Sequence, residues 1–107
     1  MESLNKVELK GTVGSKKITV VGDKKLANFS VATTYGYKDK DGNAIMETTW
    51  HRVNAWSGGE ISEETLEKID KLTPVHVIGR LRAMRYINAD GNETMTYEIL
   101  ASKVEII

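Results

Sequence analysis

The sequence predicts a single all-β domain with one short helix, and three observations lead to this fold class. Before residue 57 and after residue 74 the chain alternates with period two and is rich in Val, Ile, Thr and Tyr. Asp-Gly pairs in KDKDGN (38–43) and NADGN (88–92) lie between strand patterns, as in β-hairpins. Only residues 57–74 show helical spacing. A small barrel with a helix after its third strand is the arrangement of the OB-fold, a five-stranded Greek-key barrel.

Six segments carry the strand patterns. They are 4–13, 16–25, 26–37, 48–56, 74–87 and 94–107. The segment 16–25 is a short strand or ribbon, so we expect three or four strands before the helix and two after it. Gly11 and Gly79 interrupt two of these patterns, and we expect them to mark bends where a small barrel turns its corners. The alternating set that we expect to face the core in the segment 74–87 is Val75, Val77, Gly79, Leu81 and Ala83.

The predicted helix has clear signals at both ends. Ser62 is a good N-cap, and acidic residues follow it in the first turn, where the helix dipole favours negative charge. Ile61 and Leu66 have the spacing of a hydrophobic staple. The remaining signals are an apolar stripe of Leu66, Ile69 and Leu72, basic residues Lys68 and Lys71 near the end, and Pro74 as the stop.

Length and composition limit the possible classes of protein. The 107 residues are enough for one core, so we treat 1–107 as one domain. Cysteine is absent, which excludes disulfides and thiolate metal sites and suits a reducing compartment. The N-terminus MESLNKVELK has no apolar signal region, and no apolar run approaches transmembrane length. We therefore expect a cytoplasmic protein without a membrane span.

The net charge is zero, with 15 basic and 15 acidic residues, which by itself argues against a nucleic-acid-binding protein. The charges are unevenly distributed, however. Residues 58–72 hold five acidic and two basic residues, so the rest of the chain has 13 basic and 10 acidic residues. The negative charge can therefore lie on one segment, away from a modestly basic surface.

The stretch TTWHRVNAW (48–56) contains both tryptophans of the chain. On a strand, one face would carry Trp50, Arg52, Asn54 and Trp56, and the smaller residues around Val53 would face the core. Both tryptophans could instead be half-buried packing residues, as tryptophan often is. The arginine and asparagine between the two rings favour a surface on which nucleic-acid bases stack.

A second stripe combines aromatic and basic residues. It is the outward set of segment 74–87, namely His76, Ile78, Arg80, Arg82, Met84 and Tyr86. Tyr35, Tyr37, Lys38 and Lys40 form a similar group at another strand end and its hairpin. Aromatics interleaved with basic residues are typical of surfaces that bind single strands. The alternative is that exposed strand positions favour Tyr and Arg in any case.

No catalytic or metal-binding constellation is present in the sequence. His51 has no Asp, Glu or Cys at ligand spacing, so a packed or interface histidine is the better interpretation. DKDGN (39–43) lacks the Gly and Glu that a calcium loop needs at its later positions. Gly58-Gly59 is followed by glutamates and not by a phosphate-loop Lys-Ser/Thr. We predict neither an enzyme nor a bound cofactor or metal.

Four segments resemble, in order and spacing, the bacterial single-stranded-DNA-binding protein family. They are NKVELKGTVG (5–14), LANFSVATT (26–34), TTWHRVNAW (48–56) and PVHVIGRLRAMRY (74–86). The resemblance implies an OB-fold that binds single-stranded DNA in replication, recombination and repair, with bases stacked on aromatics. The matching positions are Tyr37, Trp50, Trp56 and Tyr86, and basic partners are expected at Lys38, Arg52, Arg80 and Arg82.

The resemblance also implies assembly. Family members usually form homotetramers from dimers that pair through the first strand, which here begins near Lys6 and Val7. The residue matching His51 lies at a subunit interface. Family members generally continue into a flexible tail with an acidic tip that recruits partners, whereas this sequence stops at Ile107. We therefore expect no tail-mediated recruitment, and a tetramer or a dimer.

Two other functions compete with DNA binding. A tail-less subunit of this fold could act mainly through protein–protein contacts, as in a primosome or a mobile-element complex. An oligosaccharide-binding OB-fold would use the same aromatics but would not need Arg52, Arg80 and Arg82.

Overall fold

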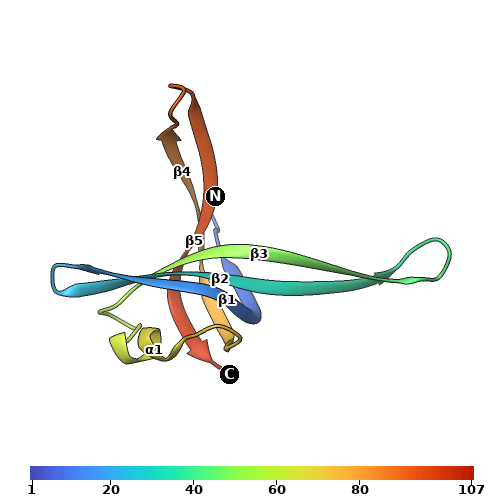
Figure 1. Ribbon diagram of the computed structural model, residues 1–107, viewed down its shortest axis with the longest axis horizontal. Coiled ribbons are helices and arrows are strands. Elements are labelled where there is room, and N and C mark those ends of the chain that lie inside the picture. Colours follow the sequence, from blue (N-terminus) through green and yellow to red (C-terminus); the bar gives the residue numbers. More distant parts are fainter.

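A computed structural model describes all residues from 1 to 107 and contains five strands and one helix (Figure 1). The elements are β1 (Val7–Val21), β2 (Lys24–Lys38), β3 (Ala44–Trp56), α1 (Glu63–Lys68), β4 (Pro74–Ile87) and β5 (Glu93–Ile106). The strands close a barrel in the order β1-β2-β3-β5-β4. All pairs are antiparallel except the short β3–β5 contact, where Val53 lies beside Ile99 and Asn54 beside Leu100. This is the predicted OB-fold, with the helix after the third strand.

β1 takes part in two strand pairs. Residues Val7–Thr12 pair with β4, and the rest of the strand from Thr12 pairs with β2. The register shifts between Val13 and Lys16, which marks a bulge where the strand bends from one partner to the other. The segment 16–25, predicted as a short strand or ribbon, is the ribbon at the end of the β1–β2 hairpin and not a strand of its own, so three strands precede the helix. Its residues up to Val21 complete β1, the turn lies at Gly22, whose φ of 62° favours glycine, and Lys24 begins β2.

The strands are longer than the barrel, so three hairpins extend from it as arms (Figure 1). β2 and β3 stay paired from Leu26 and Trp56 to Lys38 and Ala44. β3 therefore begins four residues before the predicted start at residue 48. β4 and β5 form the upright arm. The turns predicted at 38–43 and 88–92 are confirmed.

The core is a cluster of 14 buried apolar residues. They are Leu9, Val13, Ala27, Phe29, Val31, Val53, Ala55, Ile61, Leu66, Ile69, Val75, Val77, Ile99 and Val104. The prediction for β4 is confirmed at Val75, Val77 and Gly79 but was wrong at Leu81 and Ala83, which are exposed. Past Gly79, β4 leaves the barrel and pairs only with β5, so no second layer covers its inward face.

The helix α1 closes one end of the barrel (Figure 1). Ser62 is its N-cap, since its hydroxyl accepts a hydrogen bond from the Thr65 amide at 3.1 Å. Ile61 and Leu66 are both buried, in agreement with the predicted staple. The helix ends at Ile69, where the backbone becomes extended, so Leu72 does not join the apolar stripe and is 73% exposed. No helix of this protein has the length and apolarity needed to span a membrane.

Two lysines of the barrel bind the helix. Lys16 Nζ donates to the carbonyl oxygens of Leu66 and Glu67, each at 3.2 Å, which satisfies acceptors of the last turn. Lys25 Nζ lies 2.6 Å from a Glu63 oxygen and 2.5 Å from a Glu67 oxygen. Hydrogen bonds to Glu63 and then Glu67 raise the pKa of Lys25 to about 12. Part of the acidic segment is therefore engaged in holding α1 against the barrel.

Gly11 and Gly79, where we predicted bends, lie where strands approach too closely for a side chain. The register of the β4–β5 pair shifts at Gly79, whereas the shift in β1 lies after Gly11, between Val13 and Lys16. A Cβ atom on Gly79 would overlap the carbonyl oxygen of Leu100, and one on Gly11 would overlap the carbonyl oxygen of Ala32. The obstructing atoms are backbone, so a side chain could be accepted only by moving a strand.

We predict that Gly79→Ala lowers the free energy of unfolding by about 1–3 kcal/mol, the range typical of overpacking in a tight site. Urea unfolding of the two proteins measures the difference. Gly36→Ala is the matched control, because its Cβ would meet only the flexible Met46 side chain, with Sδ at 3.1 Å. Equal stability of the two variants would contradict the close approach at Gly79.

Candidate nucleic-acid interface

The tryptophan face lies on the outside of the barrel. Val53 and Ala55 are buried, so the alternation of β3 turns Trp50, Arg52 and Trp56 outward. Trp50 is 61% exposed and Trp56 is 38% exposed. The rings are therefore available at the surface, and the alternative that both are half-buried packing residues does not hold for Trp50.

The outer positions of β2 and β3 form a surface without any carboxylate. On β2 they are Asn28, Ser30, Ala32, Thr34, Gly36 and Lys38, and on β3 they are Ala44, Met46, Thr48, Trp50, Arg52, Asn54 and Trp56. Small or polar residues lie opposite the candidate residues, since Ala32 pairs with Trp50 and Ser30 with Arg52. Such a surface leaves the ring faces open and does not repel a phosphate backbone.

The Trp50 ring rests on the backbone of β1. A Cβ atom on Gly14 would overlap atoms Cζ3 and Cη2 of the ring. Gly14 lies in the bulge of β1, beside β2, so the Trp50 ring reaches it from β3 across β2. Sequence analysis missed this role of Gly14, because only the register of the folded sheet reveals which side chain crosses the glycine.

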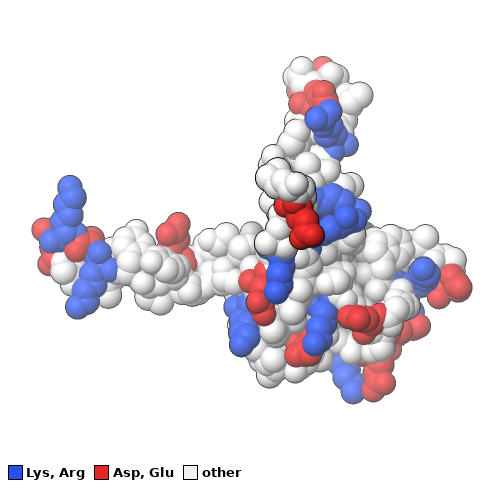
Figure 2. All heavy atoms as spheres, turned by 180° about the vertical axis from the view of Figure 1, so that it is seen from behind, with Lys and Arg blue, Asp and Glu red and all other residues white.

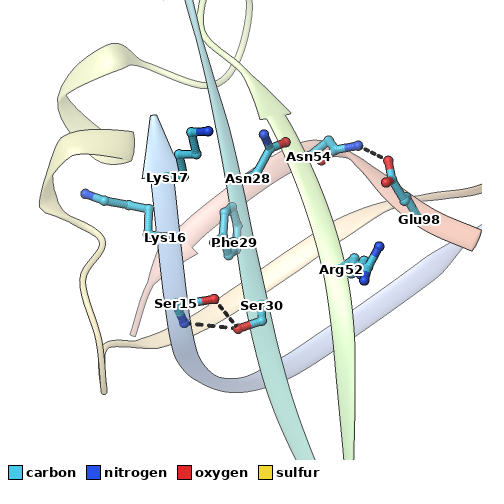
Figure 3. A pocket seen from close by; sticks show the side chains of 9 residues that line it. All are labelled: Ser15, Lys16, Lys17, Asn28, Phe29, Ser30, Arg52, Asn54 and Glu98. Atoms are coloured by element: carbon cyan, nitrogen blue, oxygen red, sulfur yellow. Dashed lines mark hydrogen bonds between the residues drawn. The ribbon is translucent and has the colours of Figure 1, made fainter. Parts of the chain in front are cut away.

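A polar groove runs beside the tryptophans (Figure 3). Its lining residues are Ser15, Lys16, Lys17, Asn28, Phe29, Ser30, Arg52, Asn54 and Glu98. The Ser15 amide donates to the Ser30 hydroxyl at 3.0 Å, which fixes one wall. Asn54 Nδ2 donates to a carboxylate oxygen of Glu98 on β5. Amides and cations in one groove can bind base edges and phosphates, and sequence analysis did not include Lys17 or Glu98.

The stripe on β4 continues the same surface. Asn54 lies beside Leu100 of β5, Leu100 pairs with Arg80, and Glu98 pairs with Arg82, so these residues share the outer side. Arg80 is exposed, whereas Arg82 is half-buried and its Nε is buried without a hydrogen-bond partner. Tyr86 lies farther along the upright arm and is 52% exposed. Figure 2 shows basic side chains at the base of this arm and at the tip of the β2–β3 arm, which extends to the left in that view.

Tyr37 lies apart from the tryptophans. It alternates with the core residues of β2, so it faces the opposite side of the β2–β3 arm from Trp50. The Tyr35 and Tyr37 rings lie side by side on that face, with centroids 6.0 Å apart. Lys38 ends β2 near the hairpin tip and is exposed. The structure therefore brings together Trp50, Arg52, Trp56, Arg80 and Arg82, but not Tyr37.

The residues predicted at subunit contacts lie elsewhere. His51 is half-buried, its Nε2 lies 2.8 Å from the Thr33 hydroxyl, and it borders a second groove with Leu81 and Tyr97. Val7 begins β1 and pairs with Gly79, and the exposed Lys6 precedes it. No strand pairs with the other edge of β1 before Thr12.

An OB-fold whose outer face carries exposed tryptophans, arginines and amides defines a nucleic-acid-binding class of protein. No three His, Asp or Glu side chains converge as they would in a metal site. The model of the single-strand binding protein family matches residues 4–107, and the chain belongs to this family.

Relatives of known name match nearly the whole chain. Single-stranded DNA-binding protein 1 of Xylella fastidiosa (strain 9a5c) is 36% identical over 110 residues, covering 100% of this chain and 79% of the relative. The single-stranded DNA-binding protein of Xanthomonas axonopodis pv. citri is also 36% identical, over 97% of this chain and 58% of its own length. The chain thus spans between about three fifths and four fifths of these relatives.

Solved structures agree with the fold. The structure described as Plasmodium falciparum SSB in complex with ssDNA has a TM-score of 0.83 and 27% identity, covering 100% of this chain and 96% of that one. A deletion mutant of the Thermus aquaticus single-stranded DNA binding protein has a TM-score of 0.80 at 20% identity, over 97% of this chain and 50% of that one, and supports the fold alone.

We predict that Gly14→Ala lifts the Trp50 ring from β1, because the new methyl group would occupy the position of the ring. In a Trp56→Phe background, where Trp50 is the only tryptophan, acrylamide should quench the emission more strongly after the change. In a Trp50→Phe background the same change should leave quenching of Trp56 unaltered. Equal quenching of Trp50 with and without the methyl group would argue against the contact.

Proposed function

We propose that this protein binds single-stranded DNA with little sequence preference and acts in replication, recombination or repair of DNA in the cytoplasm. The observation that carries the proposal is the outer face of β3, where two exposed tryptophans flank Arg52 and Asn54. Flat rings stack with any base, at about 1–3 kcal/mol per base, and therefore bind without reading sequence. Membership of the single-strand binding protein family supports the same function.

The basic residues would supply the second part of the binding energy. Arg52, Arg80 and Arg82 face the same side as the tryptophans, and none of them forms an ion pair with a carboxylate. Lys17 and Lys38 extend the positive charge along β1 and β2. Tyr86, on the β4–β5 arm, offers a further stacking position. Tyr37 could stack on a base only if the bound DNA passes round the β2–β3 arm.

We predict that oligo-dT quenches tryptophan emission and that the affinity falls with salt. The slope of log K against log salt should be about −0.7 per phosphate neutralised. Arg82→Ala should weaken binding and make the slope shallower by about 0.7 if one phosphate contact is lost. Arg85→Ala is the matched control, because Arg85 lies on the opposite face of β4, 3.7 Å from Glu93. Arg85→Ala should change neither the affinity for oligo-dT nor the salt slope substantially.

Two outcomes would contradict this proposal. Unchanged emission at saturating oligo-dT would count against stacking on Trp50 and Trp56. A slope near zero in the parent protein would favour the oligosaccharide-binding alternative. The protein–protein alternative has one supporting observation, an exposed apolar stripe of Leu81, Met95 and Tyr97 on the inward face of the β4–β5 arm.

We also propose a homotetramer built from two dimers, with a plain dimer as the alternative. From Val7 to Gly11, β1 pairs with β4 along one edge and has no partner strand along the other, and unpaired edges tend to pair with a second copy. Two identical edges in antiparallel contact give a two-fold axis. His51 lies half-buried beside the exposed Leu81 and Tyr97, a mixture typical of a surface that another subunit covers.

We predict that sedimentation at micromolar concentration gives a tetramer mass. His51→Lys should shift it towards smaller species, because it forces a charge into a half-buried position beside apolar side chains. Asn43→Lys, which adds the same charge at the exposed hairpin tip, is the control and should leave the mass unchanged. A monomer mass for the parent protein would sink the proposal.

A further inference from the structure

Glu98 is the carboxylate of the outer face. The outer positions of β2 and β3 hold no Asp or Glu, and the outward set of the β4–β5 arm has Glu98 as its acidic member. Glu98 reaches the groove from β5 and is half-buried there (Figure 3). A carboxylate in the middle of a surface that must receive phosphates opposes binding, so its presence needs a physical account.

The surroundings of Glu98 are those of an anion-binding position. Asn54 Nδ2 donates to its carboxylate, Arg52 lines the same groove, and Arg82 is its direct partner across the β4–β5 pair. Glu98 nevertheless forms no ion pair within 4.0 Å, and Arg82 Nε is buried without a partner. The guanidinium groups therefore keep donors free while the carboxylate offsets part of their charge.

We propose that the Glu98 carboxylate competes with the phosphate backbone of DNA for the donor groups of the groove. This competition weakens DNA binding and so keeps it reversible. In the free protein the carboxylate occupies the Asn54 amide and lies among the guanidinium groups, whose donors stay free. A phosphate that enters the groove must share Asn54, Arg52 and Arg82 with a like charge. This inference rests on the proposed function and assigns Glu98 the role of a residue that tunes affinity.

The physical reason is Coulombic. A phosphate entering the groove would lie within several ångströms of Glu98, inside the screening length of about 10 Å at 0.1 M salt. Because the site is half-buried, water screens the repulsion less than it would on an open surface. Removal of the negative charge should therefore strengthen binding most at low salt.

The test compares Glu98→Gln with the parent protein in oligo-dT titrations followed by tryptophan emission. We expect the affinity at low salt to rise about three- to tenfold, the effect of one screened charge at this range. The salt slope should become steeper by up to about 0.7, since one more protein charge is free to neutralise a phosphate. Glutamine keeps an oxygen for the Asn54 hydrogen bond, so the change alters charge with little alteration of shape.

Glu47→Gln is the matched control. Glu47 is an exposed carboxylate on the opposite face of the β2–β3 arm, so it reports the effect of net charge alone. We expect less than about a twofold change there, because exposed charges beyond a screening length interact little. An equal gain in both variants would overturn the local role of Glu98.

Two further variants separate charge from structure. Asn54→Ala removes the hydrogen bond and leaves the carboxylate, so it should not strengthen binding. In an Arg82→Gln background, the gain from Glu98→Gln should shrink, because the carboxylate acts partly by offsetting Arg82. A gain from Asn54→Ala as large as that from Glu98→Gln would overturn the proposal.

The outcomes distinguish the two proposals. A parent protein that does not bind oligo-dT would sink the proposed function. A parent protein that binds, together with a Glu98→Gln variant of equal or weaker affinity, would sink only the role of Glu98. Thermal unfolding verifies that the variants are folded, and Glu98→Thr, which suits a strand, replaces Glu98→Gln if the glutamine variant is unstable.

Discussion

The double pairing of β1 is the constraint on which the rest of the structure depends. The first half of β1 pairs with β4 and the second half pairs with β2, so the strand bends between Val13 and Lys16. The bend closes the barrel and buries a continuous core. It also brings Gly14 next to the Trp50 ring, in a position where a Cβ atom would overlap two ring atoms. The same division leaves one edge of β1, the edge away from β4, without a partner before Thr12.

Strands that extend beyond the barrel as arms provide additional exposed surfaces on which the candidate aromatic residues lie. Inside the barrel, the alternation of each strand separates core from solvent, as Val53 and Trp50 illustrate. Along the arms both faces are exposed, so residues with the periodicity of core positions, such as Tyr37 and Leu81, become accessible. The arms thus multiply the accessible aromatic surface beyond what a closed barrel of 107 residues could offer.

The balance of charge follows from where the acidic residues lie. Glu63, Glu64 and Glu67 belong to the helix, where they pair with Lys25 and Lys68 at one end of the barrel. The outer face keeps its arginines without ion pairs, and Glu98 is the carboxylate beside them. A net charge of zero is therefore compatible with a surface for a polyanion, because exposed charges on separate faces, farther apart than the screening length of about 10 Å at 0.1 M salt, interact little. Stacking on neutral rings adds a component of binding that depends little on salt.

The sequence by itself determined the class of fold, the hairpin turns, the start of the helix and the outward side of β3. These depend on local rules: alternation along a strand, Asp-Gly turns, and the capping of a helix by Ser62. Local patterns also gave two wrong predictions, since Leu72 and Leu81 fit the apolar patterns but lie outside the core. Only the tertiary structure decided that one bulged strand runs from Val7 to Val21, that Tyr37 turns away from Trp50, that Gly14 meets the Trp50 ring and that Glu98 lines the groove. Those facts depend on strand register and barrel closure, which bring together residues far apart in the chain, and no periodicity within a single segment encodes such contacts.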